Sequence, residues 1–140
     1  MKEGKVFCFH HGWHFLLADE FPMQKALEKH KDKNGHCFYE LDYIEENWER
    51  VTLPHTFNDT DLFRDRIKDA GSGQKRTAVF YRNYLTVPKE YCGQKVLIEF
   101  EGIRQTCYLY VNGKMVGYVE NGVAPFGFDL TPFIDYDKPN

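Results

Sequence analysis

The 140-residue sequence has no long uninterrupted apolar run and no concentration of charge of one sign. No apolar stretch approaches the roughly 20 residues that a bilayer-spanning helix needs. Lysine and arginine number 18 against 21 aspartates and glutamates, and no basic stripe runs along the chain. Nucleic acids and anionic membrane surfaces are therefore poor candidate partners, and we expect neither.

The opening residues, MKEGKVFCFHHGWHF, lack the pattern of a secretory signal. Two histidines interrupt the apolar stretch, and no small-residue cleavage site follows it. Because such signals are removed during export, the sequence leaves the compartment open between cytoplasm and periplasm.

The cysteines are few and widely spaced, at positions 8, 37, 92 and 107. Irregular spacing favours reduced thiols over a disulfide framework. Cys107 alternates with Leu109 and Val111 in a strand-like run, so we expect it to be a small buried core residue. A bridge between Cys8 and Cys37 stays open as the alternative.

Two groups of residues resemble catalytic or metal sites but are better interpreted otherwise. Cys8, His10 and His14 would share one face of a strand, yet no closed zinc spacing is present, and we expect no metal and no cofactor. Glu99 and Glu101 lie two apart on one strand face, which is typical of a solvated surface rather than of an acid/base pair.

The chain is rich in aromatic residues, and these fall mostly in alternating runs that indicate β-strands. Asn112-Gly113 is a strong hairpin signal between two such runs. A short surface helix is expected over 22–31 with Pro22 as its first residue, a polar turn over 31–36, and a tight turn over 129–134. The expected strands are 5–9, 13–17, 48–53, 78–87, 95–101, 105–111 and 114–119.

Many short strands at this spacing favour an all-β fold, a β-sandwich of the jelly-roll type. The strand pattern stops before such a sandwich would be complete. We therefore expect residues 1–140 to be one domain, incomplete at its C-terminus, within a longer polypeptide.

Six motifs occur in order along nearly the whole chain, and together they resemble the N-terminal sugar-binding domain of family 2 glycoside hydrolases. This is the family of the β-galactosidases and β-glucuronidases. The sequence departs from the family pattern at Phe80, where tryptophan is usual, and at residues 121–124. The motifs are His11-Gly12-Trp13-His14-Phe15, Trp48-x-x-Val51-x-Leu53-Pro54-His55-x-Phe57, Phe80-Tyr81-Arg82 with Val87-Pro88, Phe100-Glu101-Gly102-Ile103, Tyr110-Val111-Asn112-Gly113 with Val116-Gly117, and Pro125-Phe126-x-Phe128-Asp129-Leu130-Thr131.

The resemblance implies a galactose-binding-domain-like jelly roll followed by an immunoglobulin-like domain and a (β/α)8 barrel. In this family the two catalytic glutamates of retaining hydrolysis lie in the barrel, so no catalytic residue is expected within 1–140. The domain would pack on the barrel, shape one wall of the carbohydrate pocket and take part in contacts of a homo-oligomer. A stand-alone carbohydrate-binding module and an interaction domain remain alternatives.

Residues 58–77 read as a long polar loop, and loops of this length in compact domains are commonly functional. Within it, Asn58, Asp59, Asp61 and Arg64 have the donors and acceptors that sugar hydroxyls need, and they are the candidate substrate-binding residues. The competing interpretation is a solvated loop.

Aromatic residues outside this loop are expected to be structural. Trp13 and Trp48 could stack on sugars, but burial in the core fits their alternating strands better. Tyr108 and Tyr110 share a strand face that could point outward and bind a sugar or a partner, with a domain interface as the favoured interpretation.

Overall fold

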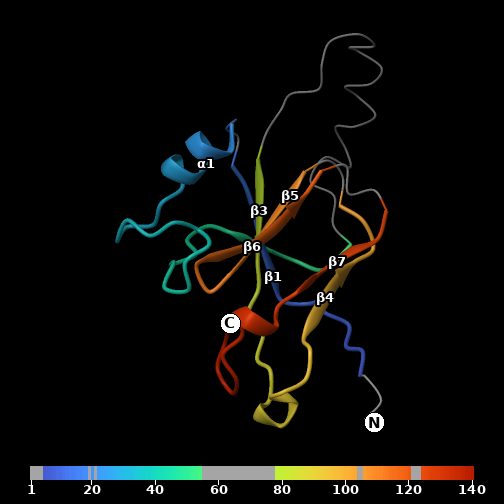
Figure 1. Cartoon of the computed structure of the whole chain (residues 1–140). Coiled ribbons are helices and arrows are strands. Elements are labelled where there is room, and N and C mark those ends of the chain that lie inside the picture. The colour runs from blue at the N-terminus through green and yellow to red at the C-terminus, as the bar shows by residue number, and fades with distance from the viewer. Residues whose placement is uncertain (1–4, 19, 21, 55–77, 104–105, 121–123) are drawn as a thin grey trace. The chain divides into compact units, whose positions relative to one another are not determined.

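A computed structural model describes residues 5–18, 20, 22–54, 78–103, 106–120 and 124–140. Figure 1 labels the strands and the helix along the chain. The chain forms two compact units. Unit 1 comprises Met1–His30 and Glu46–Asn83, and unit 2 comprises Lys31–Glu45 and Tyr84–Asn140. Across the described residues, no helix has the length and apolar character needed to cross a membrane.

Unit 1 contains an antiparallel three-stranded sheet in the order β2-β1-β3. Strand β1 (Trp13–Leu17) lies in the middle, between β2 (Glu49–Val51) and β3 (Val79–Arg82). Alternation along β1 places Trp13 and Phe15 on one face, where they pack with Val51. This face holds the first hydrophobic core of the chain.

The other face of this sheet is occupied by Phe80 of β3, which is only 1% exposed. The ring of Trp48 stacks on it at 6.2 Å between centroids, and the His30 ring meets it edge-on at 6.1 Å. His30 follows helix α1 (Met23–Lys29), whose Ala26 is fully buried. The helix therefore buries one small residue, Ala26, and its C-cap residue His30 contacts the sheet at Phe80.

Unit 2 contains two antiparallel strand pairs. Strand β4 (Leu97–Phe100) pairs with β7 (Phe126–Asp129), and β5 (Cys107–Val111) pairs with β6 (Lys114–Val119). Two short 3-10 helices, η1 (Lys89–Tyr91) and η2 (Thr131–Phe133), complete the unit.

The core of unit 2 is aliphatic. Val87, Leu130 and Ile134 are buried, and half-buried side chains from the strands, including Leu109 and Val116, pack around them. The ring of Phe128 lies so close to Gly117 that an added Cβ there would stand 2.8 Å from it. Glycine at 117 thus allows β6 to approach the β7 ring closely.

The hairpin turn between β5 and β6 is built by Asn112 and Gly113, whose φ angles of 51° and 82° are those of a type I′ turn. The Asn112 side-chain amide donates hydrogen bonds to the Phe133 carbonyl oxygen at 2.9 Å and to Asn140 Oδ1 at 2.8 Å. The turn residue therefore also joins the hairpin to η2 and to the last residue of the chain.

The segment from Lys31 to Glu45 is organised around the Asp32 carboxylate. It accepts hydrogen bonds from the backbone N–H groups of Asn34, His36 and Ile44 at 2.8–3.0 Å. Burial acts to raise the pKa of Asp32, but these bonds and one from the His36 ring outweigh it, and the pKa falls to about 2. The ionised carboxylate therefore links the two ends of the 31–45 segment by hydrogen bonds, and we call it the ionised hub of this segment.

Most expected elements are present, several of them with shorter bounds. The strand over 13–17, the hairpin around Asn112-Gly113, the helix and the tight turn at 129–134 are confirmed. The strand predicted over 78–87 ends at Arg82, and Thr86 forms only an isolated bridge with Pro139. The loop over 58–77 lies outside the described residues.

Three other expectations were wrong in detail. Residues 5–9 form no strand, because Val6 and Phe7 are exposed and gain nothing from pairing in a sheet. Pro22 precedes the helix as its N-cap instead of being its first residue. Cys107 is half-buried rather than fully buried, although burial still raises the pKa of its thiol. All four cysteines are free, so Cys8 and Cys37 form no bridge.

Candidate functional site

The four candidate substrate-binding residues of the sequence, Asn58, Asp59, Asp61 and Arg64, lie outside the described residues. Their role stays a prediction.

The two tryptophans have structural surroundings. Trp13 is buried, and its indole N–H donates a hydrogen bond to the Phe9 carbonyl oxygen at 2.7 Å, so its expected place in the core is confirmed. Trp48 is half-buried and stacked on Phe80, which makes it a cover of the core. Neither ring is placed as an open platform for a sugar.

The acidic and metal-like groups of the sequence form no site in the part of the chain that the structure describes. Glu99 and Glu101 are both exposed, as expected for a solvated strand face. No group of three or more histidine, cysteine, aspartate or glutamate side chains among the described residues could hold a metal ion. That statement covers Cys8, His10 and His14.

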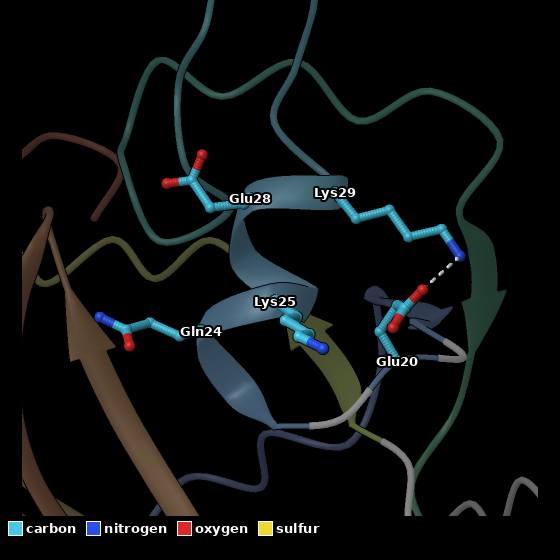
Figure 2. Close-up of a pocket in the computed structure, with 5 residues that line it drawn as sticks. All are labelled: Glu20, Gln24, Lys25, Glu28 and Lys29. Atoms are coloured by element: carbon cyan, nitrogen blue, oxygen red, sulfur yellow. Dashed lines mark hydrogen bonds and ion pairs between the residues drawn. The ribbon is translucent and has the colours of Figure 1, made fainter.

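Figure 2 shows an open hollow beside helix α1 in unit 1. Lys29 and Glu20 point toward one another there and form an ion pair, with 3.3 Å between Nζ and Oε1. Both side chains are well exposed, so this pair contributes little to stability. The hollow is lined by flexible polar side chains without an enclosed apolar wall, which makes it a poor ligand site. The lining residues are Glu20, Gln24, Lys25, Glu28 and Lys29.

A more informative surface lies on the outer face of the β5–β6 hairpin in unit 2. Tyr108 of β5 lies directly opposite Tyr118 of β6, and Tyr110 lies opposite Met115. These side chains point away from the inner face, where Leu109 and Val111 pack into the core. Tyr108 is 40% exposed, Met115 49% and Tyr118 57%.

The tyrosine rings on this face are arranged in stacked pairs. Tyr108 and Tyr118 lie 5.7 Å apart between centroids with 25° between their planes. Tyr110 stacks on Tyr39 from the preceding loop at 4.4 Å and 12°. Phe38 meets both rings of that second pair edge-on. We call Tyr39, Tyr108, Tyr110 and Tyr118 the tyrosine strip.

The loop that carries Tyr39 is fixed to the hairpin by its backbone, since the Gly113 N–H donates to the Tyr39 carbonyl oxygen at 3.1 Å. A hydrogen bond with the Cys37 side chain, the nearby Cys37 charge and burial raise the pKa of Tyr39. Burial, with smaller effects from Tyr108 and Cys37, raises the pKa of Tyr110. Both phenols therefore keep their protons at neutral pH.

Sequence reasoning identified Tyr108 and Tyr110 as one strand face but missed Tyr118. A regular ladder from the Asn112-Gly113 turn would pair Tyr118 with Cys107 on the inner face. A β-bulge shifts the register between Leu109 and Tyr110, so that Tyr118 faces Tyr108 instead. Because a one-residue slip moves a side chain to the opposite face, this bulge creates the outer tyrosine pair.

Comparison with known proteins identifies the family. Residues 38–139 match the family described as glycosyl hydrolases family 2, sugar binding domain. The chain belongs to this family. The match covers unit 2 from Phe38 to Pro139, with the whole tyrosine strip, and the part of unit 1 from Glu46 to Asn83.

Individual relatives of this family 2 chain are much longer proteins. A β-glucuronidase of Formosa agariphila is 41% identical over 104 residues, which are 72% of this chain and 11% of the relative. A β-galactosidase of Thermoanaerobacter pseudethanolicus is 37% identical over 98 residues, or 70% of this chain and 12% of the relative. The chain thus spans about a tenth of the length of these curated relatives.

The fold agrees with the family assignment. The solved structure of a β-glucuronidase from glycoside hydrolase family 2 superposes with a TM-score of 0.67 at 32% identity, covering 94% of this chain and 13% of that one. A structure of β-glucuronidase 2 of Bacteroides uniformis gives a TM-score of 0.62 at 24% identity, covering 94% of this chain and 13% of that one. The expectation of an all-β fold of the sandwich type is confirmed.

Proposed function

We propose that this chain is the sugar-binding domain of an enzyme that hydrolyses β-linked glycosides, with β-glucuronides as the first substrate class and β-galactosides as the second. The observation that carries the proposal is the 41% identity to a β-glucuronidase, compared with 37% to a β-galactosidase. The structural match at 32% identity is also to a β-glucuronidase.

In this proposal the chemistry belongs to parts of the enzyme beyond residues 1–140. Two carboxylates of a (β/α)8 barrel act there as acid/base and as nucleophile in a retaining hydrolysis. An immunoglobulin-like domain lies between that barrel and the sugar-binding domain. The present chain packs on the barrel and forms one wall of the pocket, with Asn58, Asp59, Asp61 and Arg64 donating and accepting hydrogen bonds to the sugar.

The test is hydrolysis by the full-length polypeptide of 4-nitrophenyl β-D-glucuronide and of 4-nitrophenyl β-D-galactoside. Release of nitrophenolate is expected from the first at a higher kcat/KM than from the second. Residues 1–140 alone, used as the control, are expected to release none. Turnover by that control would contradict the placement of the catalytic glutamates, and a full-length protein inactive on both glycosides would contradict the proposed activity.

A non-catalytic carbohydrate-binding domain is the second candidate, because the tyrosine strip presents aromatic rings at the surface without charged groups. The intact mass of the polypeptide in its source cells separates the two. An enzyme of this family is expected to be several times heavier than the 16.6 kDa of residues 1–140. A native mass near that value would favour the second candidate.

A further inference from the structure

The ring of Tyr118 is the open end of the tyrosine strip. Tyr108 covers one side of it, yet 57% of the residue remains exposed. More than half of the residue is thus open to solvent, although Tyr108 stacks on one side of its ring. In contrast, Tyr110 at the turn end is enclosed by Tyr39, Phe38 and the cross-strand Met115.

The exposed area suits a small ligand better than a protein. A tyrosine or methionine side chain has on the order of 200 Å² of surface, so Tyr108, Met115 and Tyr118 together expose about 300 Å². A stable protein interface needs roughly 800 Å² from each partner. The three side chains alone are smaller than such an interface, and they are large enough to cover one face of a single ring-shaped molecule.

The chemistry of the patch is amphipathic and neutral. Tyrosine offers a flat apolar ring with a hydroxyl at its edge, and it loses little conformational entropy when a ligand binds. A pyranose ring has the matching features, since its axial C–H bonds form an apolar face and its hydroxyls surround the rim. No side chain among Tyr108, Tyr110, Met115 and Tyr118 carries a charge, so nothing there would pair with an acidic sugar.

We propose that the open side of Tyr118, backed by Tyr108, binds an uncharged pyranose ring of a β-linked carbohydrate chain by stacking. The choice of carbohydrate as ligand class rests on the proposed function, while the position of the site rests on the geometry of the hairpin. The β-bulge that turns Tyr118 outward is part of the site, because without it the ring would face the core.

The experiment measures the Kd of β-1,4-galactotetraose by titration calorimetry on the full-length protein, with its catalytic pocket blocked by a covalent inactivator. Tyr118→Ala is expected to weaken binding about tenfold or more, which is the loss typical of removing a stacking ring. Tyr118→Phe keeps the ring and should stay within about threefold of the wild type. Tyr84→Ala, at another exposed tyrosine of unit 2, is the matched control and should not change Kd.

Hydrolysis of the 4-nitrophenyl glycosides by the unblocked variants separates this inference from the proposed function. Normal hydrolysis with no binding of the tetrasaccharide, or with equal Kd in wild type and Tyr118→Ala, would overturn the stacking site and leave the activity standing. Binding that depends on Tyr118 without any hydrolysis would support the site and remove the activity. A Tyr118→Ala variant with a clearly lower Tm and slower hydrolysis would show that the ring is packed inside the protein, which also overturns the site.

Discussion

The two units of the chain are stabilised in different ways. Unit 1 buries large aromatic side chains, with Trp13 and Phe15 on one face of its sheet and Phe80 on the other. Unit 2 buries the aliphatic Val87, Leu130 and Ile134 together with one aromatic residue, Tyr43, and leaves the tyrosines of β5 and β6 partly exposed. Its loops are closed by single polar side chains that bind several backbone groups at once.

The difference shows that a count of aromatic residues does not reveal their role. In unit 1 an aromatic residue fills volume, and its loss leaves a cavity. In unit 2 the exposed rings of Tyr108 and Tyr118 lie outside the core, so we expect their loss to cost little stability. Polar residues have the structural role in unit 2, where Asp32 and Asn112 each form several hydrogen bonds that join separate segments.

The largest effect on stability is expected from Phe80→Ala. The side chain is almost fully buried between Trp48 and His30, and its removal should lower the free energy of unfolding by about 3–5 kcal/mol. Both tryptophans of the chain lie in unit 1, so urea unfolding followed by tryptophan fluorescence reports on this unit.

Tyr118→Ala is the matched control for this comparison. It removes a ring of similar size from the surface of unit 2 and should change stability by less than about 1 kcal/mol. An equal loss of unfolding free energy in Phe80→Ala and Tyr118→Ala would show that both rings are packed in a core. The proposed difference between the two units would then be wrong.

Local patterns in the sequence predicted the elements that are governed by neighbouring residues. Alternation predicted β1 and the β5–β6 hairpin, and Asn112-Gly113 predicted its turn. The bulge at Leu109/Tyr110 has no such local signal, and the neighbouring contact of Gly117 with the Phe128 ring is made only in the folded chain. As a result, the sequence indicated the strand face of Tyr108 but not that of its partner Tyr118.

The long-range hydrogen bonds of Asp32 and Asn112 could not be predicted from the sequence for a similar reason. Asp32 was expected only within a polar turn, yet its carboxylate also binds the N–H of Ile44, 12 residues away. Asn112 was expected only as a turn residue, yet its amide reaches Phe133 and Asn140, 21 and 28 residues away. Such contacts require the folded chain, whereas the turn propensity of the same residues is local.

An intermediate effect is expected from Asn112→Ala in unit 2. This change removes two hydrogen bonds and places alanine at a positive φ, and together these should cost about 1–3 kcal/mol. Asn112→Gly tolerates the backbone conformation and loses only the hydrogen bonds, so it should cost less. Near-UV circular dichroism of the tyrosines during urea unfolding measures both.

The informative result is which of the two variants, Asn112→Ala or Asn112→Gly, is the more stable. If Asn112→Gly is as stable as the wild type, the amide contributes nothing beyond its turn conformation. In that case the link between the hairpin and η2 would not hold unit 2 together.

The smallest effect is a pH dependence assigned to Asp32. Its pKa is lowered from the ordinary 3.8 to about 2 in the folded chain, so the unfolded chain binds the proton more tightly. The stability contributed by the carboxylate is therefore fully present above about pH 4 and is lost as the pH falls from about 4 to 2. Asp32→Asn cannot titrate and keeps only one oxygen to accept the three backbone N–H groups.

The variant should be less stable than the wild type at pH 7, and the gap should narrow below pH 4. Measuring the free energy of unfolding of both proteins from pH 7 to 2 isolates this residue, because other acids such as Asp129, whose pKa is also lowered by Thr131, contribute equally to the two curves. Parallel curves over this range would mean that the Asp32 carboxylate is not the ionised hub of the 31–45 segment. A gap that closes only below pH 4 would confirm that the ionised Asp32 carboxylate stabilises unit 2.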